Sequence, residues 1–163
     1  RSSDLEKLKK LYNGSEFCVM HGDLCFNNIL YDLYSGTIRL IDARGSFGPS
    51  IKSIYGDQLY DIAKISHSVI GAYDYIVNGF YSYTEEKNNF YYKIHERKDH
   101  NIITKLNNEF ILKLDYKLSD ISLIMGLLFI AMTPLHNDDV TRQKVFYLHG
   151  IKFLNEATEV AQQ

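Results

Sequence analysis

The sequence reads HGDLCFNNIL over residues 21–30, and this segment is followed after a short turn by IRLID over residues 38–42. The apolar residues FCVM at positions 17–20 come directly before it and predict a short strand. That strand would deliver the HGD triplet into a loop. We therefore expect the fold to be organised around this loop.

Two further strands are predicted after the loop. Residues 28–31 (NILY) and 37–41 (TIRLI) are predicted to be these strands, and residues 32–36, which read DLYSG, are typical of a turn. Asp42 then ends a strand antiparallel to the one that Asn28 begins, so we expect the two residues to lie at the same edge of a small hairpin.

Asp23, Asn28 and Asp42 have the side chains that phosphoryl transfer requires. The protein mainly positions an acceptor hydroxyl and neutralises the phosphates with metal ions. One carboxylate must accept a hydrogen bond from the acceptor, while an amide oxygen and a second carboxylate hold a hard cation. These three residues can fill the three roles.

The ordered motifs resemble those of the aminoglycoside phosphotransferase and choline kinase family, whose fold is similar to that of protein kinases. The motifs are the HGD triplet with Asn28 five places after Asp23, then Ile41-Asp42, then GDQLYDIA at residues 56–63. The resemblance implies that Asp23 is the catalytic base, that Asn28 and Asp42 bind Mg²⁺, and that ATP is the phosphoryl donor.

The resemblance also implies residues that support the catalytic loop. His21 would pack beneath the loop, Gly22 would allow a tight turn, and Asp61 would accept backbone hydrogen bonds from the loop. Asp57 precedes a predicted helix and is interpreted as its N-cap. Arg44 stands where many relatives carry an aromatic or acidic residue, so its role stays open.

The predicted fold class is α+β and mostly helical, with the small hairpin carrying the catalytic and metal-binding loops of a protein-kinase-like C-terminal lobe. A single domain over residues 1–163 is expected. Residues 1–14 predict one helix through Leu5, Leu8 and Leu11, and contain no phosphate-covering loop or strand lysine. We therefore expect the N-terminal ATP-binding lobe to be missing from this chain.

The rest of the sequence predicts helices at residues 58–70 and 73–80, at 121–132 and from Asp138-Asp139 onward. Ser119-Asp120 is the expected cap of the third, whose apolar run is too short to span a bilayer. The intervening segment at residues 80–100 is rich in tyrosine and charge. A surface of this kind could bind a sugar or an amine, although a solvent-facing hairpin around residues 86–89 is the favoured interpretation.

Composition narrows the classes of partner. A net charge of -2 and a pI near 6.3 give no electrostatic footprint for nucleic acid, and no basic run indicates a membrane surface. Cys18 and Cys25 are the only cysteines, and without a secretory signal they indicate reduced thiols in a cytoplasmic protein. His67 is expected to pack in a helix, and the histidines at 95, 100, 136 and 149 lack ligand spacing.

The favoured function is an ATP-dependent phosphotransferase lobe that moves the γ-phosphate to a hydroxyl of a small molecule, such as a sugar, an amino alcohol or an aminoglycoside. A second possibility is a kinase-like binding or regulatory module that transfers nothing. A metal-dependent phosphohydrolase is disfavoured because such enzymes commonly use a His-Asp dipeptide or clustered histidines, and no His is directly followed by Asp in this sequence.

Overall fold

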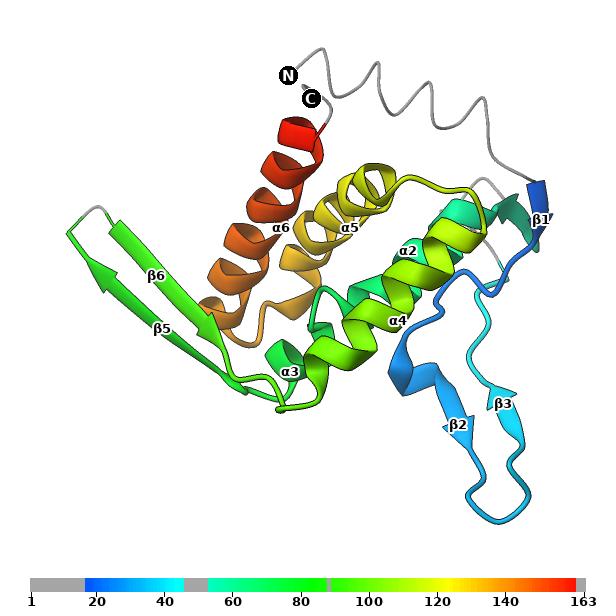
Figure 1. Ribbon diagram of the computed structural model, residues 1–163. Helices are drawn as coiled ribbons and strands as arrows, with labels where there is room; N and C mark the ends of the chain where they lie inside the picture. The colour runs from blue at the N-terminus through cyan, green and yellow to red at the C-terminus, as the bar shows by residue number, and fades with distance from the viewer. Residues whose placement is uncertain (1–16, 46–52, 88, 161–163) are drawn as a thin grey trace. The chain divides into compact units, whose positions relative to one another are not determined.

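The computed structural model describes residues 17–45, 53–87 and 89–160 (Figure 1). The helix predicted for residues 1–14 lies outside these residues. The described chain is α+β and 54% helical with small antiparallel sheets, which confirms the predicted fold class at this level. Contacts group the chain into two compact units, one up to Ile65 and one from Ser66.

The described part of the first unit contains two short antiparallel strand pairs. Strand β1 (Phe17–Val19) pairs with β4 (Tyr55–Asp57), and β2 (Ile29–Tyr31) pairs with β3 (Ile38–Leu40). A single 3₁₀ turn, η1 (Phe26–Asn28), leads into β2. The strands β1, β2 and β3 were predicted within one or two residues, whereas β4 was not.

The turn between β2 and β3 forms as the sequence predicts. The carboxylate of Asp32 accepts hydrogen bonds from the backbone N–H of Tyr34 at 2.9 Å and from Ser35 Oγ at 2.6 Å. Gly36 has a φ of +69°, a left-handed conformation that glycine adopts without strain. The hydrogen bond from Ser35, followed by those from the backbone, lowers the pKa of Asp32.

Helix α2 (Gln58–Val69) begins at the predicted cap and runs from the first unit into the second. Asp57 Oδ1 accepts a hydrogen bond of 2.8 Å from the backbone N–H of Leu59, which confirms Asp57 as an N-cap. Asp61 and Lys64 are three positions apart on this helix, so they point to the same face.

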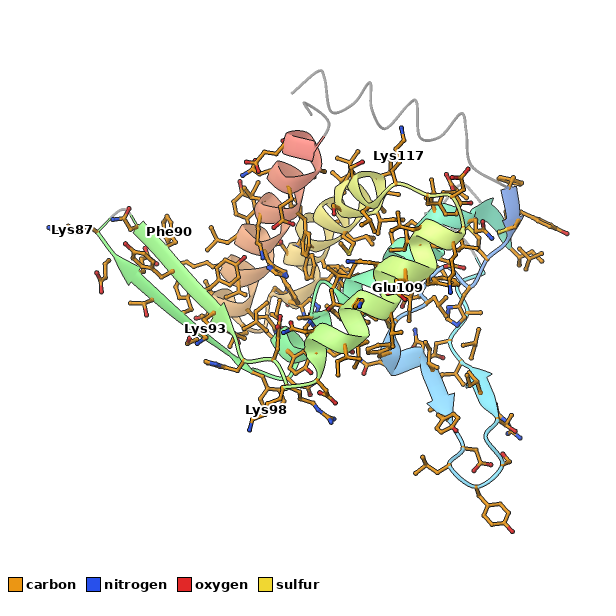
Figure 2. All side chains as sticks on the ribbon, viewed as in Figure 1. Lys87, Phe90, Lys93, Lys98, Glu109 and Lys117 are labelled. Atoms are coloured by element: carbon orange, nitrogen blue, oxygen red, sulfur yellow. The ribbon has the colours of Figure 1, made fainter. Side chains whose placement is uncertain are left out.

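The second unit contains one hairpin and four further helices among the described residues. Their bounds are α3 (Tyr73–Val77), β5 (Tyr81–Glu86), β6 (Asn89–Ile94), α4 (His100–Lys113), α5 (Leu118–Met132), the 3₁₀ turn η2 (Thr133–His136) and α6 (Val140–Val160). The antiparallel pair β5 and β6 confirms the predicted hairpin. Figure 2 shows Lys87 and Phe90 near its tip.

Helix α4 was not predicted, and its buried residues explain why. They are His100, Asn107 and Ile111, so two of the three are polar and no hydrophobic periodicity marks the buried face. Asn107 Nδ2 donates a hydrogen bond of 3.0 Å to Ser66 Oγ, which satisfies its amide within the unit.

Helices α5 and α6 lie side by side (Figure 1), and Gly126 and Gly150 meet where the two helices cross. A Cβ atom at Gly150 would lie 2.9 Å from the carbonyl oxygen of Gly126, and one at Gly126 would lie 2.8 Å from side-chain atoms of Leu154. Either side chain would force the helices apart, because real Cβ contacts are longer than this. The glycines therefore permit a backbone-to-backbone crossing.

The start of α5 differs from the prediction. The helix begins at Leu118 after an N-cap at Lys117, so Ser119-Asp120 lies inside the first turn, where the Asp120 charge favours the helix dipole instead of capping it. The apolar stretch is also longer than predicted. Residues Leu118–His136 form 19 residues of mean hydropathy 1.8, which satisfies the length and composition of a membrane span. Core helices meet the same criterion, so this finding is weak.

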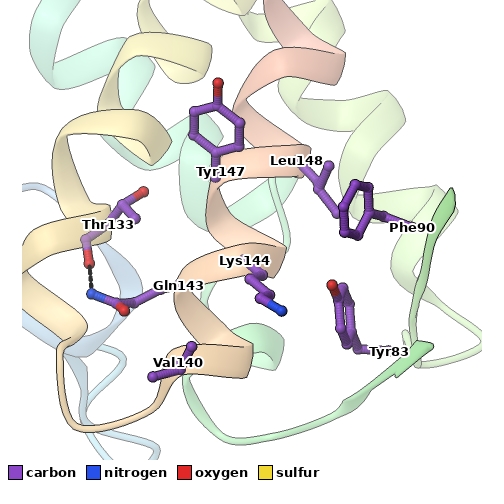
Figure 3. A pocket seen from close by; sticks show the side chains of 8 residues that line it. All are labelled: Tyr83, Phe90, Thr133, Val140, Gln143, Lys144, Tyr147 and Leu148. Carbon is purple, nitrogen blue, oxygen red and sulfur yellow. Dashed lines mark hydrogen bonds between the residues drawn. The ribbon is translucent and has the colours of Figure 1, made fainter. Parts of the chain in front are cut away.

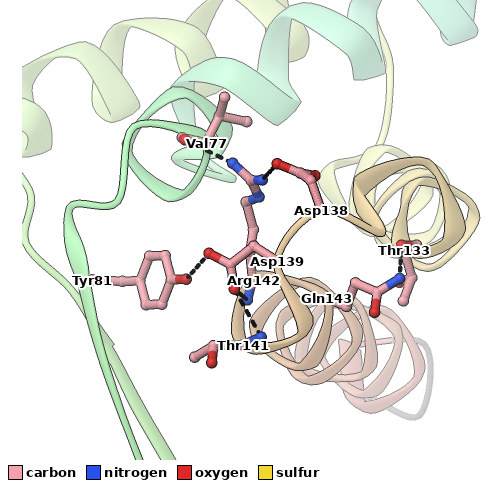
Figure 4. Close-up of polar contacts among 8 residues, drawn as sticks. All are labelled: Val77, Tyr81, Thr133, Asp138, Asp139, Thr141, Arg142 and Gln143. Atoms are coloured by element: carbon pink, nitrogen blue, oxygen red, sulfur yellow. Dashed lines mark hydrogen bonds and ion pairs between the residues drawn. The ribbon is translucent and has the colours of Figure 1, made fainter.

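The N-terminus of α6 is held by a polar network (Figure 4). Asp139 Oδ1 accepts hydrogen bonds from the backbone N–H groups of Thr141 at 2.9 Å and Arg142 at 3.0 Å, as predicted for a helix that begins after Asp138-Asp139. The Arg142 guanidinium donates to the carbonyl of Val77 at 3.2 Å and pairs with Asp138. Arg142 thereby links α6 to α3.

A buried histidine joins β6 and α6. Tyr92 Oη donates a hydrogen bond of 2.9 Å to His149 Nδ1, and His149 Nε2 donates one of 2.9 Å to the carbonyl of Gly71. The ring of His149 also contacts Phe129 and Phe153 edge to face. Burial lowers the pKa of His149 to about 4 and raises the pKa of Tyr92 to about 12. The imidazole is therefore neutral at physiological pH.

The low pKa of His149 predicts acid sensitivity of the second unit. Between pH 6.5 and 4 the unfolded chain binds a proton at this position and the folded chain does not, so stability is complete above pH 6.5 and falls as the pH drops. We expect the free energy of unfolding of the wild type to fall more steeply than that of His149→Gln, by about 1.4 kcal/mol per pH unit. Urea titrations across this range measure both slopes, and parallel curves would contradict the assignment.

Candidate active site

The backbone brings Asn28 and Asp42 to the same end of the β2/β3 hairpin. The strands pair with Ile29 opposite Leu40, and the backbone N–H of Ile41 donates a 3.0 Å hydrogen bond to the carbonyl of Asn28. Asn28 and Ile41 therefore extend the ladder by one position, and Asp42 follows directly. This is the juxtaposition expected from the sequence.

His21 connects the HGD loop to the end of β3. Its Nδ1 accepts a 3.3 Å hydrogen bond from the backbone N–H of Asp23, so its Nε2 carries the proton and donates at 2.9 Å to the carbonyl of Ile41. The carbonyl of His21 accepts a 2.7 Å hydrogen bond from the backbone N–H of Arg44. The buried imidazole thus fixes the segment before Asp23 against the segment before Asp42.

Asp61 holds the backbone of the same loop from helix α2. Its Oδ2 accepts a 2.7 Å hydrogen bond from the N–H of His21, and its Oδ1 accepts a 2.8 Å hydrogen bond from the N–H of Gly22. Gly22 has a φ of +77°, which allows two consecutive N–H groups to turn toward one carboxylate without strain. These are the contacts that the family resemblance implies for Asp61.

Replacing Asp61 should destabilise the first unit. In Asp61→Asn the amide nitrogen cannot accept a hydrogen bond, so one loop N–H of His21 or Gly22 loses its partner. We expect a loss of about 2 kcal/mol in the free energy of unfolding, measured by urea denaturation. Asp57→Asn is the matched control, because Asn caps helices about as well as Asp. Equal stability of the two variants would contradict the supporting role of Asp61.

The amide of Asn28 is oriented by Asp23. Nδ2 donates to the carbonyl oxygen of Asp23 at 2.8 Å and makes a longer contact of 3.4 Å with its carboxylate Oδ2. Both partners are acceptors, which assigns the nitrogen and leaves the amide oxygen as the atom that a cation would bind. Asn28 is buried, so its orientation is fixed before any ligand arrives.

Lys64 is a site residue that the motifs did not indicate. Its Nζ lies 2.7 Å from Asp23 Oδ1, and its side chain is 8% exposed against 29% for Asp23. A signal was nevertheless present, because Lys64 follows Asp61 by three residues and shares its helix face. Because Asp61 is predicted to contact the loop, Lys64 on the same helix face could have been predicted to lie near that loop.

Asp42 has an unusual backbone. Its φ is +56°, in the left-handed region that residues other than glycine, asparagine and aspartate rarely adopt. Its side chain is exposed, unlike the buried amide of Asn28. Strained residues of this kind gather at functional sites.

The donor atoms near the hairpin end fit Mg²⁺ better than a soft metal. Within the described residues, no group of three or more His, Cys, Asp or Glu could hold a metal ion. Mg²⁺ does not require one, since it is usually bound by one or two protein oxygens together with phosphates and water. The amide oxygen of Asn28 and the carboxylate of Asp42 match that donor set.

The tyrosine-rich hairpin borders a separate recess of about 360 Å³ in the second unit (Figure 3). Its lining includes Tyr83 and Phe90 from the hairpin and Tyr147 from α6. Glu85, a carboxylate of the same hairpin, is paired with Lys144 at 2.6 Å and accepts a hydrogen bond of 3.0 Å from Tyr83. These hydrogen bonds, that of Lys144 first, lower the pKa of Glu85. The lining of the recess itself is mainly apolar.

Comparisons with protein-family models, with curated proteins and with solved structures gave no match. The family resemblance of the motifs accordingly stays a prediction.

Proposed function

We propose that this chain is the catalytic lobe of an ATP-dependent phosphotransferase that acts on a hydroxyl group of a small molecule. The observation that carries the proposal is the direct contact between Asp23 and Asn28. It occurs in a loop that is held by Asp61 and joined by His21 to Ile41, which lies between the end of β3 at Leu40 and Asp42. The proposed base and the amide proposed as a metal ligand are therefore in direct contact, and Asp42 follows Ile41, whose carbonyl accepts the hydrogen bond from His21.

In the proposed reaction the acceptor hydroxyl donates a hydrogen bond to the carboxylate of Asp23. Asp23 takes the proton as the acceptor oxygen bonds to the γ-phosphorus, and the bond from that phosphorus to the bridging oxygen of ADP breaks. Asn28 and Asp42 would hold Mg²⁺, which neutralises charge on the phosphates.

Exposed apolar side chains support a further lobe on the first unit. Phe17 and Val19 on β1 are 72% and 63% exposed, and Leu40 on β3 is 53% exposed. Exposed apolar surface of this kind is typical of interaction sites. It suits the proposal that an N-terminal lobe supplies the remaining contacts to ATP.

The test uses the complete protein that contains this sequence. We expect Mg²⁺- and ATP-dependent phosphorylation of at least one member of a panel of sugars, amino alcohols and aminoglycosides, detected by ADP release and by phosphorus NMR of the product. Binding of MgATP without transfer to any acceptor would instead favour a non-catalytic kinase-like module. ADP release that is independent of an acceptor would indicate hydrolysis.

A further inference from the structure

The burial of Lys64 calls for an explanation beyond packing. Its Nζ lies 2.7 Å from Asp23 Oδ1 while its side chain is only 8% exposed. Lysine is almost never buried to this degree unless it is paired. The ammonium group has therefore been withdrawn from water to meet the carboxylate of the proposed base.

Stability is a poor explanation for this pair. Removing two charges from water costs about as much as their attraction returns, and apolar residues of similar volume often stabilise a protein more. A Met at position 64 would fill similar space without that cost. The pair is better explained by what it does to Asp23.

The two oxygens of the Asp23 carboxylate have different surroundings. Oδ1 is bound by Lys64 at 2.7 Å, and Oδ2 lies 3.4 Å from the amide nitrogen of Asn28. We infer that Lys64 is a positioning residue that fixes Oδ1 and so presents Oδ2 to the acceptor hydroxyl. This inference rests on the proposed phosphotransferase function and adds to it a residue outside the motifs.

Helix α2 then positions both the loop backbone and its reactive side chain. Asp61 binds the N–H groups of His21 and Gly22, and Lys64, one turn later, binds the side chain of Asp23. The loop backbone and the carboxylate of Asp23 are thus both held by the same helix. A carboxylate free to rotate about its side-chain bonds would present the wrong oxygen, or the right oxygen at the wrong angle, for part of the time.

The same bonds form and break as in the proposed reaction. The hydroxyl proton moves to Oδ2, the acceptor oxygen forms its bond to the γ-phosphorus, and ADP leaves with the electron pair of the broken bond. The contribution of Lys64 is orientation of Asp23, so its loss should lower kcat and leave ATP binding nearly unchanged.

The test compares Lys64→Met and Lys64→Arg with the wild type in the complete protein. We expect Lys64→Met to lower kcat about 100-fold with the KM for ATP within about threefold, because a misplaced catalytic group costs rate more than binding. Lys64→Arg keeps the charge and should recover at least about tenfold of that loss. Lys105→Met, on the exposed face of α4, is the control and should match the wild type.

A double-mutant cycle separates positioning from general destabilisation. If Lys64 acts through Asp23, Lys64→Met should change kcat less than about twofold when Asp23 is already Asn, because the effects of groups that act as a unit do not add. If the wild type is active and the losses of kcat in the two single variants add, the positioning role of Lys64 is overturned and the proposed function is not. A wild-type protein that phosphorylates no acceptor would overturn the proposed function and, with it, this role. Urea midpoints of the wild type, Lys64→Met, Asp23→Asn and the double variant test the contact without turnover. Additive shifts of these midpoints would contradict the pairing of Lys64 with Asp23.

Discussion

Asp23→Asn should reduce the rate of phosphoryl transfer by about 10²- to 10³-fold, because the amide cannot take the acceptor proton. The KM for ATP should change little, since Asp23 is assigned to the acceptor and not to the metal. The variant also leaves the buried ammonium of Lys64 without its carboxylate, so we expect a lower urea midpoint as well. Steady-state kinetics with ADP detection measure the first effect and urea unfolding the second.

The matched control is Asp32→Asn, in the exposed turn between β2 and β3. It removes an equal charge from the first unit without touching the catalytic loop, so its turnover should equal that of the wild type. Undiminished turnover in Asp23→Asn would remove Asp23 from the mechanism. A rate loss of similar size in Asp32→Asn would mean that charge near the hairpin matters and that the position of Asp23 does not.

Asp42→Asn should also lower transfer by about 10²- to 10³-fold, since a metal ligand contributes several kcal/mol of charge stabilisation in the transition state. Here the signature is a higher Mg²⁺ concentration for half-maximal activity, which Asp23→Asn should not produce. Asparagine tolerates the left-handed backbone at this position, so the fold should keep its stability. Kinetics over a range of Mg²⁺ concentrations provide the measurement.

Asp42→Gly separates the side chain from the backbone. Glycine relieves the strain at a φ of +56° and should raise the free energy of unfolding by up to about 1 kcal/mol, while activity falls as in Asp42→Asn. A gain in stability together with a loss of activity would indicate that the strained conformation is retained for function. Wild-type Mg²⁺ dependence in both variants would contradict the assignment of Asp42 as a ligand.

Much of the fold near the loop was predictable because its signals are local. Short segments rich in apolar residues indicated β2 and β3, the DLYSG turn joined them, and Asp57 marked the start of α2. Strand β4 was missed because it is three residues long and pairs with β1 across nearly forty positions, which no local pattern records. The start of α5 was assigned too late, since its cap position is Lys117 and carries no capping side chain.

The site residues that belong to the sequence motifs were predictable. Motif spacing supplied Asp23, Asn28, Asp42 and Asp61. Lys64 was not obtained because its partner is 41 residues away, and an ion pair between distant residues has no spacing rule. Burial of polar side chains posed the same difficulty in α4, where His100 and Asn107 occupy positions that a hydrophobic pattern assigns to solvent.

The crossing of α5 and α6 at Gly126 and Gly150 determines how freely the second unit can vary. Because main chain meets main chain there, the separation of the helices does not depend on the size of the surrounding rings. Aromatic neighbours such as Phe129 and Phe153 could then be exchanged for other large apolar residues during evolution while the helix axes stay in place. Substitutions of Gly126 and Gly150, the smallest residues of the crossing, would then be tolerated less well than substitutions of its largest residues.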